Sequence, residues 1–94
     1  MEFIIPKGFK IFADKYTVKE YKRIDPENSW GEHSYINKTI KLKKDMTLEE
    51  KERTFFHEMI HCMLDQLGYD KLSGDEKFVD QMGAALHQII KTAK

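Results

Sequence analysis

Two histidines one helical turn apart are the residues whose types and spacing most directly indicate chemistry. His57-Glu58-Met59-Ile60-His61 has the form HExxH. Four residues advance an α-helix by about 400° and roughly 6 Å, so both imidazoles leave nearly the same face. This spacing is typical of a zinc site with His57 and His61 as ligands. Glu58 lies about 100° around the helix, where it suits a general base acting on a metal-bound water. The alternative is two surface histidines on an amphipathic helix.

A third protein ligand is expected, because two histidines bind zinc weakly and a catalytic site leaves its fourth position to water. The metzincin pattern would need Gly at 64 and His at 67, and Leu64 and Leu67 exclude it. Glu76 is the best candidate, since it begins the next predicted helix after a turn that folds the chain back. Alternatively, Glu76 has only a structural role, as the second member of a capping box with Ser73. His87 is an alternative third ligand.

Three further residues near the motif have roles that follow from spacing. Asp80 lies four residues after Glu76, on the same helix face, and could accept the outer N–H of a ligating histidine. Its alternative is an ordinary exposed helix residue. Gly83, one turn further on, has no side chain to keep two helices apart. Cys62 follows His61 but points about 100° away, so an inert buried thiol is favoured over a fourth ligand.

Two helices are predicted to position these residues. Thr47-Leu48-Glu49-Glu50 is a capping box, and the helix that it opens should run about 20 residues, to Gly68. Tyr69 to Leu72 form a turn, and Ser73-Gly74-Asp75-Glu76 has the form of a second capping box, opening a helix to about Lys91. The expected buried positions of the first helix are Phe55, Phe56, Met59, Ile60, Met63, Leu64 and Leu67, and those of the second are Val79, Met82, Leu86, Ile89 and Ile90.

The amino half is predicted to form strands. Residues 9–21 alternate and break at Asp14-Lys15, which indicates two strands and a tight turn, and residues 23–29 read as a loop. A second hairpin is expected from 30–36 and 39–43 around Asn37-Lys38. Lysines 41, 43 and 44 alternate with apolar residues and should form a solvated face. The predicted fold class is α+β: one domain, 1–94, with a small antiparallel sheet of three to four strands packed on the HExxH helix and a second C-terminal helix.

Composition limits the classes of partner. Sixteen basic and sixteen acidic residues cancel, so neither nucleic acid nor an anionic membrane is an expected partner. The balance hides a gradient, because residues 1–44 carry a net +4 and residues 45–94 a net −4. One cysteine excludes an internal disulfide, and the first residues have no signal-peptide core, so we expect a cytoplasmic protein. Oligomeric state cannot be inferred.

The sequence His57-Glu58-x-x-His61 followed by Glu76-x-x-x-Asp80 resembles the gluzincin signature. The resemblance implies a zincin-like fold with Glu76 as the third zinc ligand and Asp80 supporting a ligating histidine. Upstream, Trp30-Gly31-Glu32-His33 and Thr39-Ile40-Lys41-Leu42 resemble the edge-strand hairpin of short gluzincins, and ImmA-type peptidases of phages and mobile elements have similar layouts. Asp75 replaces the Asn of larger gluzincins, and the spacing to Glu76 is shorter. SprT-like proteins instead use a later histidine, here His87.

The expected activity is zinc-dependent peptide hydrolysis, with Zn²⁺ on His57, His61 and Glu76 and with Glu58 as general base. The peptide substrate would lie extended along Gly31, Glu32, His33, Ser34 and Tyr35 as an added strand. Tyr69, Tyr35 or His33 could donate to the oxyanion. For the two tyrosines packing is the default interpretation, and for His33 a solvent-exposed strand position.

The main alternative is a non-catalytic, zinc-containing binding module that acts as inhibitor or adaptor. The presence of Glu58 argues against it, because a structural metal site needs no base.

Overall fold

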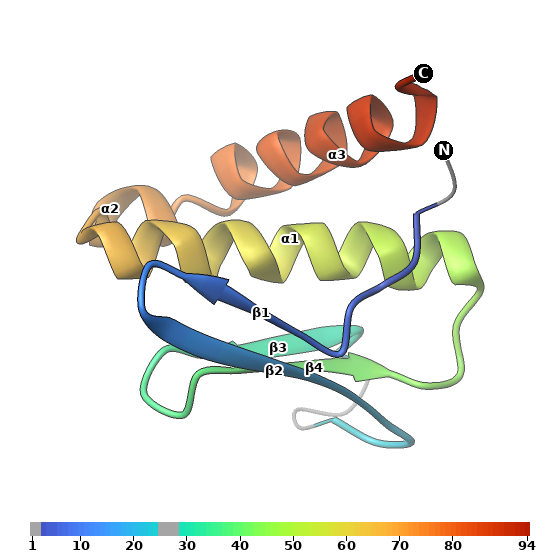
Figure 1. The fold of residues 1–94 in the computed structure, drawn as a ribbon, viewed down its shortest axis with the longest axis horizontal. Helices are drawn as coiled ribbons and strands as arrows, with labels where there is room; N and C mark the ends of the chain where they lie inside the picture. The colour runs from blue at the N-terminus through green and yellow to red at the C-terminus, as the bar shows by residue number, and fades with distance from the viewer. Residues whose placement is uncertain (1–2, 25–28) are drawn as a thin grey trace.

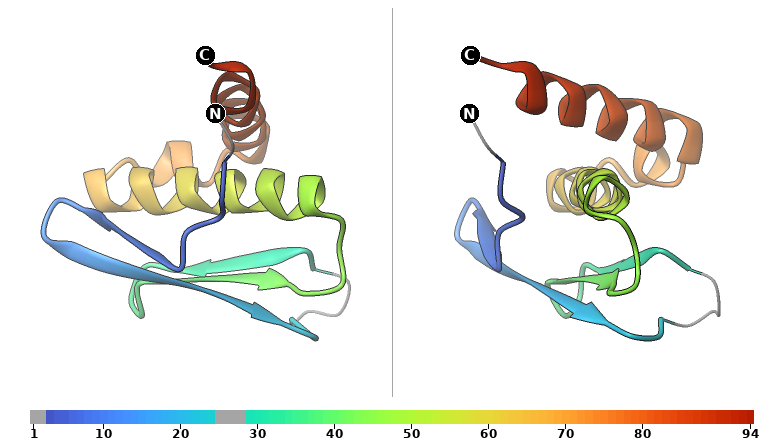
Figure 2. Two further views of the ribbon diagram at one scale, coloured as in Figure 1. Left: turned by 45° about the vertical axis from the view of Figure 1, so that its right-hand side comes forward. Right: turned by 90° about the vertical axis from the view of Figure 1, so that its right-hand side faces the viewer.

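A computed structural model describes residues 3–24 and 29–94 and shows an α+β domain built around one long helix, α1 (Leu48–Leu67). A four-stranded sheet lies on one side of α1, and the second long helix, α3 (Glu76–Thr92), lies on the other (Figures 1 and 2). The one-turn helix α2 (Asp70–Ser73) joins the two long helices. The predicted fold class is confirmed. None of the described helices is long and apolar enough to cross a membrane.

The strands are β1 (Gly8–Ile11), β2 (Asp14–Tyr21), β3 (Gly31–Ser34) and β4 (Thr39–Lys43), in the spatial order β1-β2-β4-β3. The outer pairs β1–β2 and β3–β4 are antiparallel hairpins, as predicted. The central pair β2–β4 is parallel, which the predicted antiparallel sheet did not include. It arises because the chain leaves β2, forms the edge strand β3 first and then returns between them as β4. One long side of β3 therefore has no strand partner among the described residues.

Both tight turns differ from their predicted positions. The first is Phe12–Ala13, so Asp14 and Lys15 belong to β2, where they pair with β1. The second covers Tyr35–Lys38, which places Tyr35 after β3 rather than in it. Phe12 and Lys38 take the left-handed conformation, with φ of 54° and 55°. Residues 25–28 of the predicted loop lie outside the described residues.

The core lies between the sheet and α1. Alternate residues of the two central strands point inward, Tyr16 and Val18 from β2 and Ile40 and Leu42 from β4, and they pack with Phe55 of α1. The intervening lysines of β4 point to the opposite face, as predicted. The N-terminal segment also closes the core, since the ring centroid of Phe3 lies 5.0 Å from that of Phe56.

The limits of α1 follow the predicted signals. Thr47 Oγ1 accepts a hydrogen bond from the Glu50 backbone N–H at 3.2 Å, and the Glu50 carboxylate accepts one from the Thr47 N–H at 2.9 Å. Gly68 ends the helix with φ of 83°. The prediction that Met63 and Leu67 are buried is wrong, because these side chains lie on a side of α1 that neither the sheet nor α3 covers.

Helix α3 approaches α1 through a narrow row of buried residues, Val79, Gly83 and His87. A Cβ atom at Gly83 would lie 3.1 Å from both the Cα and the N of His57, so the two helix backbones are in contact at the HExxH motif. The predicted burial of Met82 and Ile89 is wrong. The missing side chain at Gly83 allows the row through 79, 83 and 87 to face α1, which turns Met82 and Ile89 outward.

The connection between α1 and α3 is more structured than the predicted turn. Leu72 lies within the helical turn α2, and Ser73 is its last residue rather than the cap of α3. The cap is Asp75, whose Oδ1 accepts a hydrogen bond from the Phe78 N–H at 3.1 Å. The predicted second capping box is therefore wrong, because Ser73 is not the N-cap and Glu76 is the first residue of the helix rather than the third. Helix α3 ends within one residue of the expected Lys91.

Candidate metal centre

His57, His61 and Glu76 meet where the middle of α1 faces the first turn of α3. His57 Nε2 lies 3.2 Å from Glu76 Oε1, and His61 Nε2 lies 3.3 Å from Oε1 and 3.2 Å from Oε2 of the same carboxylate. One ligand atom from each residue lies within 4.8 Å of the others. We call these three residues the first ligand set. The structure thus brings together the three ligands predicted from the sequence.

The second ring nitrogen of each histidine faces a different oxygen. His57 Nδ1 lies 3.5 Å from Oδ1 of Asp80, the residue predicted to accept its outer N–H, and the Asp80 side chain is exposed. His61 Nδ1 lies 3.1 Å from Ser73 Oγ, a buried hydroxyl that the sequence analysis assigned to a helix cap. An oxygen that accepts a hydrogen bond from Nδ1 places the proton there and leaves the lone pair on Nε2. The oxygens beside both Nδ1 atoms are compatible with the tautomer that a metal ligand needs.

The chemistry of these donors fits a divalent cation. With the protons on Nδ1, the Nε2 atoms of His57 and His61 and the carboxylate oxygens of Glu76 are all acceptors. In this tautomer a cation between the three acceptors would hold them together, and two imidazoles with one carboxylate suit zinc. The site in the described chain therefore fits the zinc ion predicted from the sequence.

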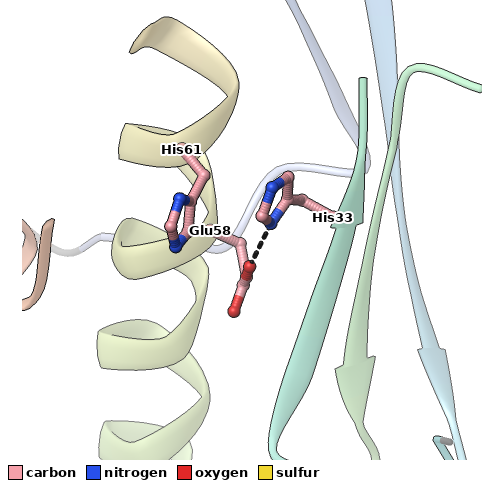
Figure 3. Close-up of side chains that lie close together, drawn as sticks. All are labelled: His33, Glu58 and His61. Carbon is pink, nitrogen blue, oxygen red and sulfur yellow. Dashed lines mark hydrogen bonds and ion pairs between the residues drawn. The ribbon is translucent and has the colours of Figure 1, made fainter. Parts of the chain in front are cut away.

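His33 on β3 lies across the cleft from the HExxH motif and contacts two of its residues (Figure 3). Its Nδ1 lies 2.7 Å from Glu58 Oε1, and its ring stacks on that of His61 with centroids 4.3 Å apart and planes 13° apart. Its Nε2 lies 3.7 Å from Asp65 Oδ2. The default interpretation of His33 as a solvent-exposed strand residue is wrong, because the side chain is only 27% exposed.

The surroundings of His33 favour its charged form. Burial alone would lower its pKa, but the hydrogen bond with Glu58 and the negative charges of Glu58, Asp65 and Glu76 outweigh burial and raise the pKa above its ordinary value. The predicted general base Glu58 is itself buried, with one carboxylate oxygen bonded to His33.

A second group of potential ligands shares His61 with the first. His33, Glu58 and His61 each offer one ligand atom, and these atoms also lie within 4.8 Å of one another. We call these residues the second ligand set. This set was not predicted from the sequence, where Glu58 was expected to act as a base and His33 to lie on the substrate strand as an exposed residue or an oxyanion donor.

Two hollows flank His57 and Glu58. The first has a volume of about 240 Å³ and lies over the metal centre, lined by Gly31, Glu32, His33, His61 and Glu76 among others. The second, of about 320 Å³, lies toward the start of α1 and the middle of α3, lined by Trp30, Arg53, Thr54, Asp80 and Ala84 among others. The edge strand β3 lines both, so the predicted substrate strand borders the site along Gly31 to His33. The second hollow was not predicted.

The other candidates for an oxyanion donor lie elsewhere. Tyr69 precedes α2 and is 56% exposed, and the ring of Tyr35 lies beneath Lys38, whose Nζ is 3.5 Å from the ring centroid. Among residues 3–24 and 29–94, no hydrogen bond joins either hydroxyl to the ligand sets.

Cys62 and His87 lie in buried environments away from the ligand atoms. Burial, reinforced by the charges of Glu58 and Asp65, raises the pKa of the Cys62 thiol to about 12, which agrees with the predicted inert thiol. His87 Nε2 lies 2.9 Å from Glu52 Oε1, and His87 belongs to neither ligand set. The alternative of His87 as third ligand has no support in the described structure.

Comparison with family models, with curated proteins and with solved structures gives no match to this chain.

Proposed function

We propose that the protein is a zinc-dependent peptidase of the gluzincin type, with His57, His61 and Glu76 as metal ligands. The observation that carries this proposal is the convergence of two Nε2 lone pairs and one carboxylate in a cleft that also contains the carboxylate of Glu58. Asp80 and Ser73 hold the two imidazoles in the required orientation.

The chemistry divides between the metal and the chain. A bound zinc ion supplies Lewis acidity, which lowers the pKa of water toward neutrality and polarises a carbonyl. Glu58 takes a proton from the attacking water and passes it to the leaving amine. One oxygen of Glu58 accepts a hydrogen bond from His33, which orients the carboxylate at the mouth of the cleft. Tyr69 as an oxyanion donor stays a prediction without a contact to support it.

The substrate is a peptide in extended conformation. The side of β3 that faces away from β4 can form a strand-like backbone ladder with it, since main-chain hydrogen bonds add a strand to an exposed sheet edge. Gly31 lines both hollows, so a peptide on this edge passes directly over Glu58. A cytoplasmic location and the absence of nucleic-acid and membrane partners remain predictions from composition.

The test is zinc content by elemental analysis, measured together with cleavage of casein or of a mixed peptide pool. Wild type should contain one zinc ion per chain and cleave. Glu58→Gln should keep the zinc and lose cleavage by about 10²-fold or more, because the amide cannot accept the proton. Glu49→Gln, which changes an exposed carboxylate in the first turn of the same helix, is the matched control and should behave as wild type.

Two results would contradict the proposal. A folded wild-type protein that takes up no zinc removes the peptidase altogether. Zinc binding without any cleavage would favour the non-catalytic, zinc-containing binding module instead.

A further inference from the structure

We infer that the chain holds a second, alternative zinc position, formed by His33, Glu58 and His61, in which the general base is itself a ligand. This inference rests on the proposed function, because it describes how the same metal centre can be inactive. Both positions lie in one cleft, and His61 is common to them.

The members of the second ligand set already lie close together. His33 Nδ1 and Glu58 Oε1 lie 2.7 Å apart and share a proton, which a divalent cation can replace because both atoms are ordinary zinc donors. The third member, His61, lies against His33 with ring centroids 4.3 Å apart (Figure 3). All three side chains are at least partly buried, which keeps competing water away.

The two positions exclude each other. A neutral imidazole has one acceptor nitrogen, so the single lone pair of His61 serves only one of the two ligand sets at a time. The chain therefore binds one ion at a time, either with His57 and Glu76 or with His33 and Glu58.

The second position is the weaker one. Stacked rings only 13° from parallel direct their lone pairs side by side rather than to one point, so His33 must tilt before both rings can bind one ion. In the first ligand set the two rings are inclined by 67°, and both already point at Glu76. An ion in the second position occupies Glu58, which then cannot accept a proton from water, so this position is inactive.

The experiment is a Zn²⁺ titration of the apoprotein in competition with a chromophoric chelator. Glu76→Ala removes the exposed carboxylate of the first ligand set and should weaken zinc binding while one ion per chain remains bound. His33→Phe keeps a ring to stack on His61 but removes both nitrogens. In the Glu76→Ala background, His33→Phe or Glu58→Gln should weaken the remaining binding by a further factor of about 10 or more. In the wild-type background, His33→Phe should change zinc affinity less than about threefold, because the stronger set is intact.

The matched control is Glu49→Gln in the Glu76→Ala background, which removes a remote carboxylate from α1 and should leave affinity unchanged. Far-ultraviolet circular dichroism checks that each variant is folded, and His33→Asn replaces His33→Phe if the latter is not. His57→Ala can replace Glu76→Ala as the background variant, since it also removes a ligand of the first ligand set only.

The inference is overturned if Glu76→Ala and His57→Ala bind no zinc, or if their remaining zinc is insensitive to His33→Phe and Glu58→Gln. In the latter case the ion stays on what is left of the first ligand set. Zinc affinity and peptide cleavage test different statements. A wild type that binds zinc but cleaves no peptide contradicts the proposed peptidase, whereas the zinc affinities of the variants still test the second position.

Discussion

At the scale of single residues, the most informative atoms are the oxygens behind the two HExxH histidines. Ser73 Oγ lies 3.1 Å from His61 Nδ1, where it can accept the ring proton and leave Nε2 free, and Asp80 has the equivalent place behind His57. Neither oxygen binds the metal in the proposed site. Their effect on zinc is indirect, through the tautomer and orientation of each ring.

Ser73→Ala tests this effect. Without the hydroxyl, His61 can place its proton on either nitrogen, and we expect zinc affinity to fall by about 10- to 100-fold. The measurement is chelator competition at neutral pH. Ser34→Ala is the control, because the Ser34 hydroxyl accepts a hydrogen bond only in the turn after β3. Equal affinities for Ser73→Ala and wild type would show that Ser73 does not orient His61.

Glu52 is a buried carboxylate that stabilises the pairing of α1 with α3. Its Oε1 lies 2.9 Å from His87 Nε2 and 3.0 Å from Lys91 Nζ. Burial raises its pKa, but the hydrogen bonds and charges of His87 and Lys91 outweigh burial, so the pKa in the folded protein is lowered. A lowered pKa stabilises the fold above the unfolded-state pKa of about 4.3, and this stabilisation disappears as pH falls through the folded-state pKa.

We therefore expect the free energy of unfolding to decrease in acid, below about pH 4.3, partly through Glu52. At pH 7, Glu52→Gln should cost about 1.5–3 kcal/mol, because His87 and Lys91 lose a buried charged acceptor. In acid the difference between this variant and wild type should shrink. Urea unfolding at both pH values measures it, and exposed Glu49→Gln should cost less than about 0.5 kcal/mol. A difference that does not depend on pH would contradict this assignment.

The sequence was sufficient to place the residues with characteristic spacing but not their neighbours. The i, i+4 relations of His57 with His61 and of Glu76 with Asp80 predicted the first ligand set and the oxygen behind His57. His33 was missed because β3, Gly-Glu-His-Ser, carries no apolar residue to show which face is inward. Ser73 was missed because its position also fits a capping box, and only the helical turn α2 redirects it to His61.

At the scale of elements, Gly83 sets the distance between α1 and α3 and with it the distance of Glu76 from the histidines. A Cβ atom at this position would meet the backbone of His57 at 3.1 Å, and a backbone cannot rotate away as a side chain can. Helix α3 would have to move outward, carrying the Glu76 carboxylate with it.

Gly83→Ala should therefore weaken zinc binding by about tenfold or more, and should destabilise the fold by roughly 1–3 kcal/mol despite the better helix propensity of alanine. Ala85→Gly, at an exposed position of α3, is the control, since it costs about 1 kcal/mol of helix propensity and should leave zinc affinity unchanged. Zinc affinity and thermal unfolding are measured for both variants. Unchanged affinity in Gly83→Ala would mean that α3 adjusts without moving Glu76.

Element limits were predictable where a local rule fixes them, and pairing was not. The backbone groups at the start of α1 are satisfied by Thr47 and Glu50, and those at its end by Gly68. Each of these hydrogen bonds joins residues only a few positions apart in the sequence. By contrast, the parallel pairing of β2 with β4 joins Thr17 to Thr39, and nothing in the alternation of either strand specifies its neighbour. The burial of Met63 and Met82 was predicted wrongly for the same reason. Periodicity identifies the apolar positions of a helix but does not show which of them a neighbouring element covers.

At the scale of the whole molecule, the proposed metal links the two long helices of a chain of only 94 residues. A ligand that binds only the folded state stabilises it by about 2.7 kcal/mol at a free concentration of 100 times its Kd. For a domain of this size that corresponds to a shift in Tm on the order of 10 °C.

Removal of zinc with a chelator should therefore lower the Tm by about 10 °C, and zinc in excess should restore it. The His57→Ala/His61→Ala double variant should unfold at the same temperature with and without chelator. Calorimetry at fixed protein concentration checks both results. A wild-type Tm that chelation does not change would exclude the metal as a stabilising ligand.

The strand order β1-β2-β4-β3 also has a consequence for how the chain folds. The two hairpins are local, whereas the parallel pair between them joins residues 22 positions apart, such as Thr17 and Thr39. Closing this larger loop costs more chain entropy than closing either hairpin. Each hairpin can therefore form and unfold by itself before β2 pairs with β4. We expect the rate-limiting event to be the pairing of β2 with β4 against α1, which makes the cleft between β3 and α1 one of the last parts of the molecule to assemble.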